Sequence, residues 1–264
     1  MIDLVETLAR VKEIVFSVGK MQKENLGRSN LKIEAKSSSI DLVTEIDKKS
    51  EEAIVDFIRR HYPSHAILAE ESGRTADVSE YLWIIDPIDG TTNYAQGLPI
   101  FAISVALQYR EETVLGVVYC PVTEQLFTAI RGQGAYLNGE KIHVSGKQKL
   151  IDCVLATGFP YDIAQNPANN IDYFSAIVLK ARAVRRIGSA AYDVCCVAAG
   201  KFDGYWELKV SLWDVAAAML MVEEAGGQII HFRQDRGISI IAGSATICEM
   251  VHREIKIVDT AAKG

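Results

Sequence analysis

An apolar run that stops abruptly at acidic residues is the feature that most constrains how this chain can fold. The run, at 81–85 (YLWII), shows no alternation of polar and apolar residues, which predicts a strand buried on both faces. The next residues, 86–93 (DPIDGTTN), include a proline that disfavours helix before it, and Gly90, which permits a left-handed turn. The sequence therefore predicts a buried strand that ends in Asp86 and Asp89, beside backbone N–H groups able to bind an anion. A divalent cation would let these acids and a phosphate share one place.

Taken alone, Asp-x-x-Asp-Gly is also common in ordinary turns. The full stretch 86–93 after a hydrophobic strand is more specific: it resembles the first signature of the inositol monophosphatase family, which are magnesium-dependent phosphomonoesterases. Residues 213–218 (WDVAAA) followed by 223–227 (EEAGG) resemble the second signature of that family. Residues 69–72 (AEES) and 41–47 (DLVTEID) match in order and spacing, so the resemblance covers nearly the whole chain.

Composition narrows the class of protein. At 264 residues with 49% hydrophobic residues, the chain is long enough for one large domain or two modest ones with a sizeable core. The net charge of -6 argues against a general nucleic-acid surface, which normally needs a basic excess. No stretch is apolar enough to predict a membrane span, and the first six residues carry acids that do not fit a signal peptide, so we expect a cytoplasmic protein.

The cysteines and histidines do not point to a metal or nucleophile site. The five cysteines form no Cys-x-x-Cys pair and have no histidine at zinc spacing, so we expect free, buried thiols. None of the five histidines stands near a plausible nucleophile, and a Ser/His/Asp hydrolase is poorly supported.

In the first half of the chain, apolar residues at helical spacing predict amphipathic helices at 2–24 and 47–61, and Thr44 can cap the second. Strands are predicted at 31–36, 66–69, 101–109, 114–120 and 125–130, with a polar loop at 36–39, a polar segment at 73–80 and a hairpin turn at 137–140. Because strand side chains alternate, Glu70 and Glu71 should point to opposite sides, with at most one of them facing the site of Asp86.

The second half alternates between strands and helices. Strands are predicted at 154–158, 184–187, 202–208, 228–232 and 238–242, and helices at 171–182, 189–199, 213–224 and from 246 onward. The segment 231–237 is shorter than the family resemblance leads us to expect.

The fold class is α+β. The resemblance implies a layered α-β-α-β-α sandwich of the sugar-phosphatase type, with an antiparallel sheet in the first half and a mixed sheet flanked by helices in the second. We expect an N-terminal α+β half at 1–146 that carries most metal ligands. A C-terminal α/β half at 147–264 would contribute Asp214 and substrate contacts.

The resemblance also implies a site that binds two or three Mg²⁺ ions, an ion that prefers hard oxygen ligands. Its metal ligands would be Glu70, Asp86, the Ile88 carbonyl, Asp89 and Asp214, with Asp86 bridging two ions. Its catalytic residues would be Glu70 and Thr91, which orient water, and Asp47, which hydrogen-bonds Thr91. Its substrate-binding residues would be Asp89, Gly90, Thr91, Gly188, Ser189, Ala190, Glu207 and Asp214.

Three of these acids also have an ordinary structural interpretation. Asp47 and Asp214 fall in the first turns of helices, where the helix dipole favours negative charge. Glu207 could be a surface acid. The helix that follows Asp214 is apolar nearly all round, however, and a buried acid without a partner is costly, which favours a metal beside Asp214.

The implied function is hydrolysis of myo-inositol monophosphate to inositol and phosphate by metal-activated water. One alternative is a related sugar or nucleotide phosphatase, such as a fructose-1,6-bisphosphatase or NADP phosphatase, including enzymes with dual activity. Another is a non-catalytic regulatory binding protein. The expected partner is a small phosphorylated polyol or sugar, with no nucleic acid and no membrane, and family likeness alone suggests a homodimer.

Overall fold

The structure is a computed structural model that describes residues 2–36, 40–75 and 77–261. The predicted polar loop at 36–39 therefore lies mostly outside the described residues, as does residue 76 of the predicted polar segment. The helices are α1 (Leu4–Asn25), α2 (Glu45–His61), α3 (Thr91–Ala95), α4 (Ile171–Val178), α5 (Ala190–Ala198), α6 (Leu212–Glu224) and α7 (Ala245–Ala261), with a 3-10 helix η1 (Leu150–Asp152).

The strands of the first half are β1 (Ile33–Ala35), β2 (Leu42–Thr44), β3 (Ala66–Ala69), β4 (Gly73–Arg74), β5 (Tyr81–Asp89), β6 (Ala102–Tyr109), β7 (Glu112–Cys120), β8 (Gln125–Ile130), β9 (Gly134–Leu137) and β10 (Glu140–Lys141). Those of the second half are β11 (Val154–Thr157), β12 (Ala183–Arg185), β13 (Gly204–Val210), β14 (Gln228–Arg233) and β15 (Ile238–Gly243). None of the helices in the described ranges is long and apolar enough to cross a membrane.

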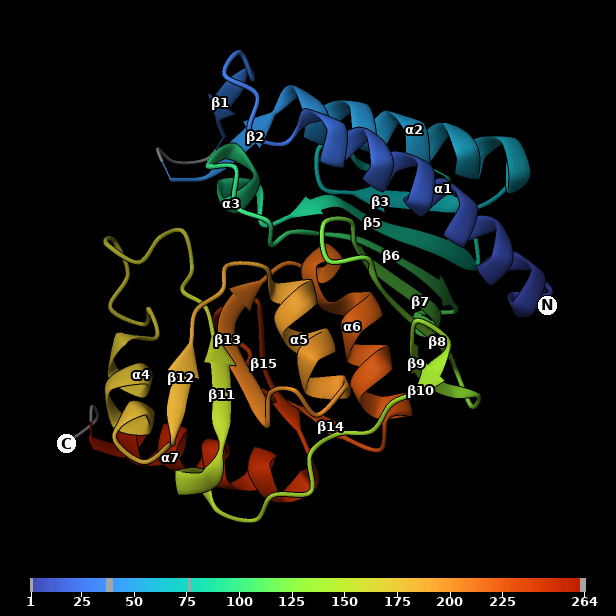
Figure 1. Ribbon diagram of the computed structural model, residues 1–264. Coiled ribbons are helices and arrows are strands. Elements are labelled where there is room, and N and C mark those ends of the chain that lie inside the picture. The colour runs from blue at the N-terminus through green and yellow to red at the C-terminus, as the bar shows by residue number, and fades with distance from the viewer. Residues whose placement is uncertain (1, 37–39, 76, 262–264) are drawn as a thin grey trace.

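The elements stack in five layers, which confirms the predicted α-β-α-β-α order (Figure 1). Helices α1 and α2 cover the outer face of an eight-stranded sheet of order β10-β9-β8-β7-β6-β5-β3-β4. Helices α5 and α6 lie between this sheet and a five-stranded sheet of order β12-β11-β13-β15-β14. Helices α4 and α7 cover the far side of the second sheet (Figure 1).

The apolar run at 81–85 becomes the buried part of β5, and its lack of polar alternation is explained by helices on both faces. Trp83 and Ile85 pack in one core with α1 and α2, whereas Ile84 packs in another with α6. Each buried isoleucine of this kind stabilises the fold by about 1.5–3 kcal/mol. Strand β5 therefore packs against a helix layer on each of its faces.

The first sheet is not wholly antiparallel, so that part of the prediction was wrong. Strands β5 to β10 are antiparallel to their neighbours, but β3 runs parallel to β5, with Ala66 opposite Leu82 and Ala69 opposite Ile85. A parallel pair needs a connection that returns the chain to the same end of the sheet. The segment 70–80, which includes the edge strand β4, makes that return. The second sheet is mixed, as predicted.

Capping chemistry sets the helix boundaries more closely than apolar spacing does. Helix α2 begins at Glu45 rather than Asp47, because the Thr44 side chain accepts from the Asp47 N–H and the Thr44 N–H donates to Asp47 Oδ2 at 3.0 Å. Helix α4 ends at Val178 rather than at 182, because the Arg182 N–H donates to the Cys153 carbonyl as β12 begins.

The division at 146/147 stays a prediction, but one core crosses it. Ala102, Val118 and Phe127 of the first sheet share a hydrophobic cluster with Val215 and Met221 of α6. The five cysteines are free and buried, as expected.

A close backbone approach joins α6 to the first sheet. A Cβ atom on Gly116 of β7 would lie 2.8 Å from the Ala217 carbonyl oxygen of α6. Backbone atoms at that distance cannot yield as a flexible side chain would. The alanine run at 216–218 and the glycine therefore allow helix and sheet to pack at short range.

We predict that Gly116→Ala lowers the free energy of unfolding by about 1–3 kcal/mol, because the added methyl group overpacks this contact. Urea denaturation measures the difference. Gly146→Ala is the matched control, since a Cβ there meets no atom within 4 Å, and it should leave stability unchanged or slightly higher. Equal effects of the two substitutions would contradict the close-packing interpretation.

Candidate active site

The predicted site residues converge on one cavity of about 620 Å³. It opens where the end of β5, the N-termini of α5 and α6 and the end of β13 meet. The predicted site residues that line it are Glu70, Asp86, Ile88, Asp89, Gly90, Thr91, Gly188, Ser189, Ala190, Glu207 and Asp214. Asp47 is the exception, since it is fully buried behind Thr91.

The end of β5 is shaped by a register shift between Asp86 and Asp89 in its pairing with β6. Asp86 Oδ1 accepts from the Ile88 N–H at 3.0 Å inside this irregular stretch. Gly90 then adopts φ +98, and a Cβ there would also lie 3.0 Å from the Gly188 carbonyl oxygen. Glycine is required on both counts for β5 to turn into α3.

Asp89 caps a helix from the other half of the chain. Its carboxylate accepts from Ser189 Oγ at 2.6 Å, from the Ala190 N–H at 3.1 Å and from the Ala191 N–H at 2.7 Å. Burial raises the pKa of Asp89 to about 6, although these three hydrogen bonds oppose the shift. The Ser189 hydroxyl and Ala190 N–H thus point at Asp89, and their predicted contact with substrate stays a prediction.

Asp86, which is buried, and Asp214, which is half-buried, complete the group of acids at the cavity. Burial raises the pKa of Asp86 well above its usual value, and the charges of Glu70, Asp89 and Asp214 raise it further. Burial also raises the pKa of Asp214, with the charge of Asp89 next in importance. Asp214 Oδ2 accepts from the Ser211 N–H at 2.7 Å, so this acid both caps α6 and faces the cavity.

Lys36 lines the cavity and pairs with one of its acids, and the sequence analysis did not select it. Its ammonium donates to Glu70 at 2.8 Å and to Glu71 at 2.5 Å. Burial lowers the pKa of Lys36, but the two carboxylates outweigh this and raise it overall. The two glutamates lie beyond the end of β3 at Ala69, so strand alternation is not what separates them. Of the two, Glu70 lines the cavity and Glu71 does not, as the sequence analysis expected of at most one.

The donor set suits a hard divalent cation. In the described ranges, no three His, Cys, Asp or Glu side chains are grouped to hold a metal ion as they are now oriented. Each carboxylate is turned instead to a protein donor: Glu70 to Lys36, Asp86 to Ile88, Asp89 to α5 and Asp214 to Ser211. Oxygen-only donors with mutually repelling charges nevertheless match the preferences of Mg²⁺.

Thr91 and Asp47 form the predicted hydrogen-bonded pair. Thr91 Oγ1 lies 2.9 Å from Asp47 Oδ1 and 3.0 Å from the Ile88 carbonyl oxygen, so its hydrogen is directed at these acceptors. Asp47 also accepts from the Thr44 hydroxyl and N–H. With its hydrogen committed, the Thr91 oxygen can accept a hydrogen bond from a molecule in the cavity.

Glu207, Arg186 and Asp193 also line the cavity. Burial raises the pKa of Glu207 to about 7, while the Tyr205 hydroxyl, which donates to it, and Arg186 oppose the shift. A Cβ on Gly158 would lie 2.2 Å from Glu207 Oε1, so glycine leaves room for this carboxylate. Sequence analysis missed Arg186 and Asp193; their nearness to the selected segment 188–190 was the available signal.

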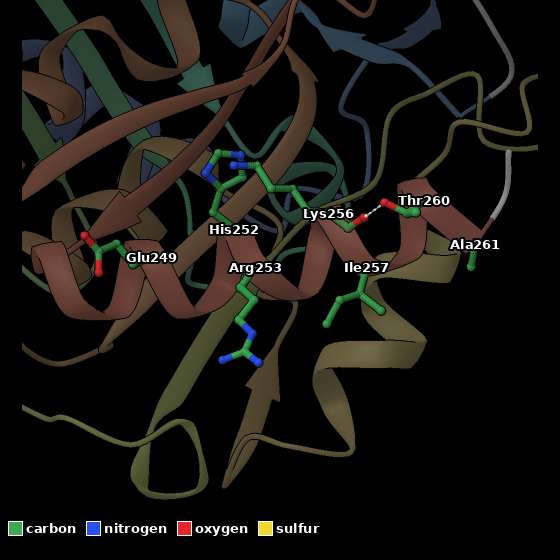
Figure 2. Close-up of a pocket in the computed structure, with 7 residues that line it drawn as sticks. All are labelled: Glu249, His252, Arg253, Lys256, Ile257, Thr260 and Ala261. Atoms are coloured by element: carbon green, nitrogen blue, oxygen red, sulfur yellow. Dashed lines mark hydrogen bonds between the residues drawn. The ribbon is translucent and has the colours of Figure 1, made fainter.

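A second hollow, of about 700 Å³, runs along α7. Figure 2 shows that its lining residues all belong to that one helix, with the Thr260 hydroxyl donating to the Lys256 carbonyl oxygen at 2.8 Å. It holds one carboxylate, Glu249, against the basic residues Arg253 and Lys256. In the part of the chain that the structure describes, only α7 lines this hollow, so we place the functional site in the cavity at the end of β5.

The chain is similar to several known proteins over most of its length. The sequence model of the inositol monophosphatase family matches residues 3–259. A relative named Nus factor SuhB, from Pasteurella multocida, is 45% identical over 206 residues, which cover 78% of this chain and 77% of the relative. A relative named fructose-1,6-bisphosphatase/inositol-1-monophosphatase, from Aquifex aeolicus, is 36% identical over 250 residues, covering 94% and 95% of the two chains. The solved structure of an inositol monophosphatase from Anabaena has a TM-score of 0.86 at 37% identity and covers 96% of each chain.

The raised pKa of Glu207 predicts a pH-dependent stability. The pKa of Glu207 is about 7 in the folded protein, against a usual value of 4.5. Protonated Glu207 therefore contributes to the free energy of unfolding, and this contribution is fully present below pH 4.5 and is lost as the pH rises through 7. Glu207→Gln, measured by denaturation in chelator at pH 5 and pH 8, should reduce that loss by roughly 1–3 kcal/mol. The exposed Glu249→Gln is the control and should keep the wild-type slope. An unchanged slope in Glu207→Gln would show that Glu207 does not ionise in this range.

Proposed function

Because this chain belongs to the inositol monophosphatase family, we propose that it is a magnesium-dependent phosphomonoesterase acting on a polyol monophosphate, with myo-inositol monophosphate as the leading substrate. The observation that carries the proposal is the convergence of two buried carboxylates, Asp86 and Asp89, and two half-buried ones, Glu70 and Asp214, with the Thr91–Asp47 pair on one cavity. A protein that only binds its ligand would not need the Thr91 hydroxyl to be oriented so that its oxygen can accept a hydrogen bond beside these acids.

The ligands of two or three Mg²⁺ ions would be Glu70, Asp86, the Ile88 carbonyl, Asp89 and Asp214. When bound, such ions activate water and neutralise charge on the phosphate. Their positive charge would also relieve the repulsion that raises the pKa of Asp86 and Asp214.

The protein itself would position the water and the phosphate. Thr91 Oγ1, whose hydrogen is directed at Asp47 and Ile88, would accept a hydrogen bond from the attacking water and fix its orientation. The backbone N–H groups of Gly90 and Thr91, where β5 turns into α3, would donate to phosphate oxygens.

The remaining wall would bind the alcohol part of the ester. Glu207 at the end of β13 would accept hydrogen bonds from hydroxyl groups, and Arg186 beside it would donate. The alcohol part of the substrate would also lie near the start of α5, at Gly188, Ser189 and Ala190.

Two alternatives keep specific support. The Aquifex relative carries both fructose-1,6-bisphosphatase and inositol-1-monophosphatase in its name, so dual activity is one of them. The Pasteurella relative is named as a Nus factor, so a regulatory role, with or without catalysis, is the other. The expected homodimer and cytoplasmic location stay predictions.

The proposal predicts phosphate release that depends on Mg²⁺. The test is a panel of myo-inositol 1-phosphate, fructose 1,6-bisphosphate, NADP and phenyl phosphate, assayed with Mg²⁺ and with chelator. We expect the highest kcat/KM for inositol 1-phosphate and no release in chelator. A flat panel would refute the enzyme, and a preference for fructose 1,6-bisphosphate or NADP would select the corresponding alternative.

Thr91→Ala should lower kcat by about 100-fold while leaving the affinity for Mg²⁺ nearly unchanged, because the hydroxyl orients water rather than holding a cation. Thr91→Ser keeps the hydroxyl and is the matched control, expected to retain most activity. Calorimetric titration with Mg²⁺ measures the affinity of each variant. A loss of Mg²⁺ affinity in Thr91→Ala as large as that in Asp86→Asn would contradict the assigned role.

A further inference from the structure

Glu51 is a buried acid on α2 that the proposed mechanism does not use. It is 4% exposed, and its carboxylate is bonded to the backbone of another segment. Its Oε2 atom accepts from the Glu71 N–H and its Oε1 atom from the Ser72 N–H, each at 2.8 Å. Hydrogen bonds from N–H groups to a carboxylate are charge-assisted and roughly twice as strong as neutral ones. The two bonds therefore fix this segment firmly to α2.

The segment that Glu51 holds is the turn between β3 and β4. These strands pair antiparallel on either side of residues 70–72. At the start of the turn, the Glu70 N–H donates to the Ile85 carbonyl oxygen of β5 at 3.1 Å, and the pairing of β3 with β5 ends there. The N–H groups of the next two residues lie outside the strands, and Glu51 supplies their acceptors.

The first residue of this turn is Glu70, which lines the cavity and is one of the proposed metal ligands. Its backbone is held on one side by the bond to Ile85 and on the other by the two bonds to Glu51. A carboxylate that binds a cation and orients a water molecule must be placed within roughly 0.5 Å of the productive geometry. Anchoring the turn at both sides of Glu70 restricts its position in this way.

The same face of α2 holds the other residue proposed to orient water. Asp47 lies four residues before Glu51, so the two side chains project from one face of the helix. Asp47 accepts from Thr91 Oγ1 at 2.9 Å. Both acids are buried, and neither is among the described residues that line the cavity. Helix α2 thus reaches the site indirectly, through Asp47 to Thr91 and through Glu51 to the turn that carries Glu70.

We propose that Glu51 is a positioning residue of the proposed phosphatase site. It fixes the turn at 70–72 so that the Glu70 carboxylate lies where it can bind Mg²⁺ and orient the attacking water. Together with Asp47, it makes α2 the common support of the two water-orienting residues, Glu70 and Thr91. This inference rests on the proposed function, in which Glu70 is a metal ligand.

The test is a double-mutant cycle of Glu51→Gln and Glu70→Gln, measured by calorimetric titration with Mg²⁺ and by kcat for myo-inositol 1-phosphate. Glutamine has nearly the same shape as glutamate, but its NH₂ group cannot accept from an N–H. Glu51→Gln alone should weaken Mg²⁺ binding about fivefold and lower kcat about tenfold with little change in KM, because Glu70 is no longer held in place. In the Glu70→Gln background, the same substitution should change the remaining Mg²⁺ affinity less than about twofold, because the group through which Glu51 acts is gone.

Glu52→Gln is the matched control, since Glu52 is the neighbouring acid on α2 but is exposed. It should keep the wild-type Mg²⁺ affinity and kcat. Hydrogen exchange checks that the turn is what is released: the Glu71 and Ser72 amides should exchange at least about tenfold faster in Glu51→Gln and at the wild-type rate in Glu52→Gln. If Glu51→Gln folds poorly, Glu51→Asp gives the same cycle, because it keeps the charge but is one methylene shorter and cannot reach both amides.

Additive effects of Glu51→Gln and Glu70→Gln on Mg²⁺ affinity would assign Glu51 a merely structural role and overturn the proposal. If the wild type binds Mg²⁺ but hydrolyses no ester, and the cycle is non-additive, the proposed function fails and the role of Glu51 in placing Glu70 stands. If the wild type is active and Glu51→Gln matches it in Mg²⁺ affinity and kcat, only the role of Glu51 fails. A wild type that binds no Mg²⁺ would refute both proposals.

Discussion

The hydrogen bonds from the start of α5 to Asp89 are the interaction on which the rest of the site depends. They join residues about 100 positions apart and fix α5 against the end of β5. Gly90 is left-handed and must lack a side chain for this contact to form, because a Cβ there would lie 3.0 Å from the Gly188 carbonyl oxygen. The cavity is thus the seam between the two halves, and any change at Asp89 acts on fold and chemistry together.

The acids around this seam stabilise the fold less than their hydrogen bonds suggest. Asp86 is buried and Asp214 half-buried, both with raised pKa values, and Lys36 pairs with Glu70 and Glu71. Carboxylates that repel one another in a desolvated place cost free energy unless they are protonated or meet a cation. Such local destabilisation is typical of a site kept for function rather than stability.

The sequence predicted the features that depend on local chemistry. The apolar run at 81–85, the left-handed Gly90 and the Thr44 cap each follow from a few neighbouring residues, and the structure confirms them. The parallel pairing of β3 with β5 was missed because strand direction is decided by the path of segment 70–80, not by residue types. Asp193 and Arg186 were missed for a related reason: only the approach of α5 to β13 turns ordinary helix and loop residues into a cavity wall.

Asp89 and Asp193 show how position on one helix end separates two chemical roles. Asp89 meets the free amides of α5 and has three donors, whereas Asp193 lies within the first turn, where the amides are already used, and keeps an oxygen without a donor. Both acids line the same cavity, and burial raises the pKa of each. The three donors at the start of α5 oppose this shift at Asp89, so the helix end favours the charged form of Asp89 and gives no comparable support to the Oδ1 atom of Asp193.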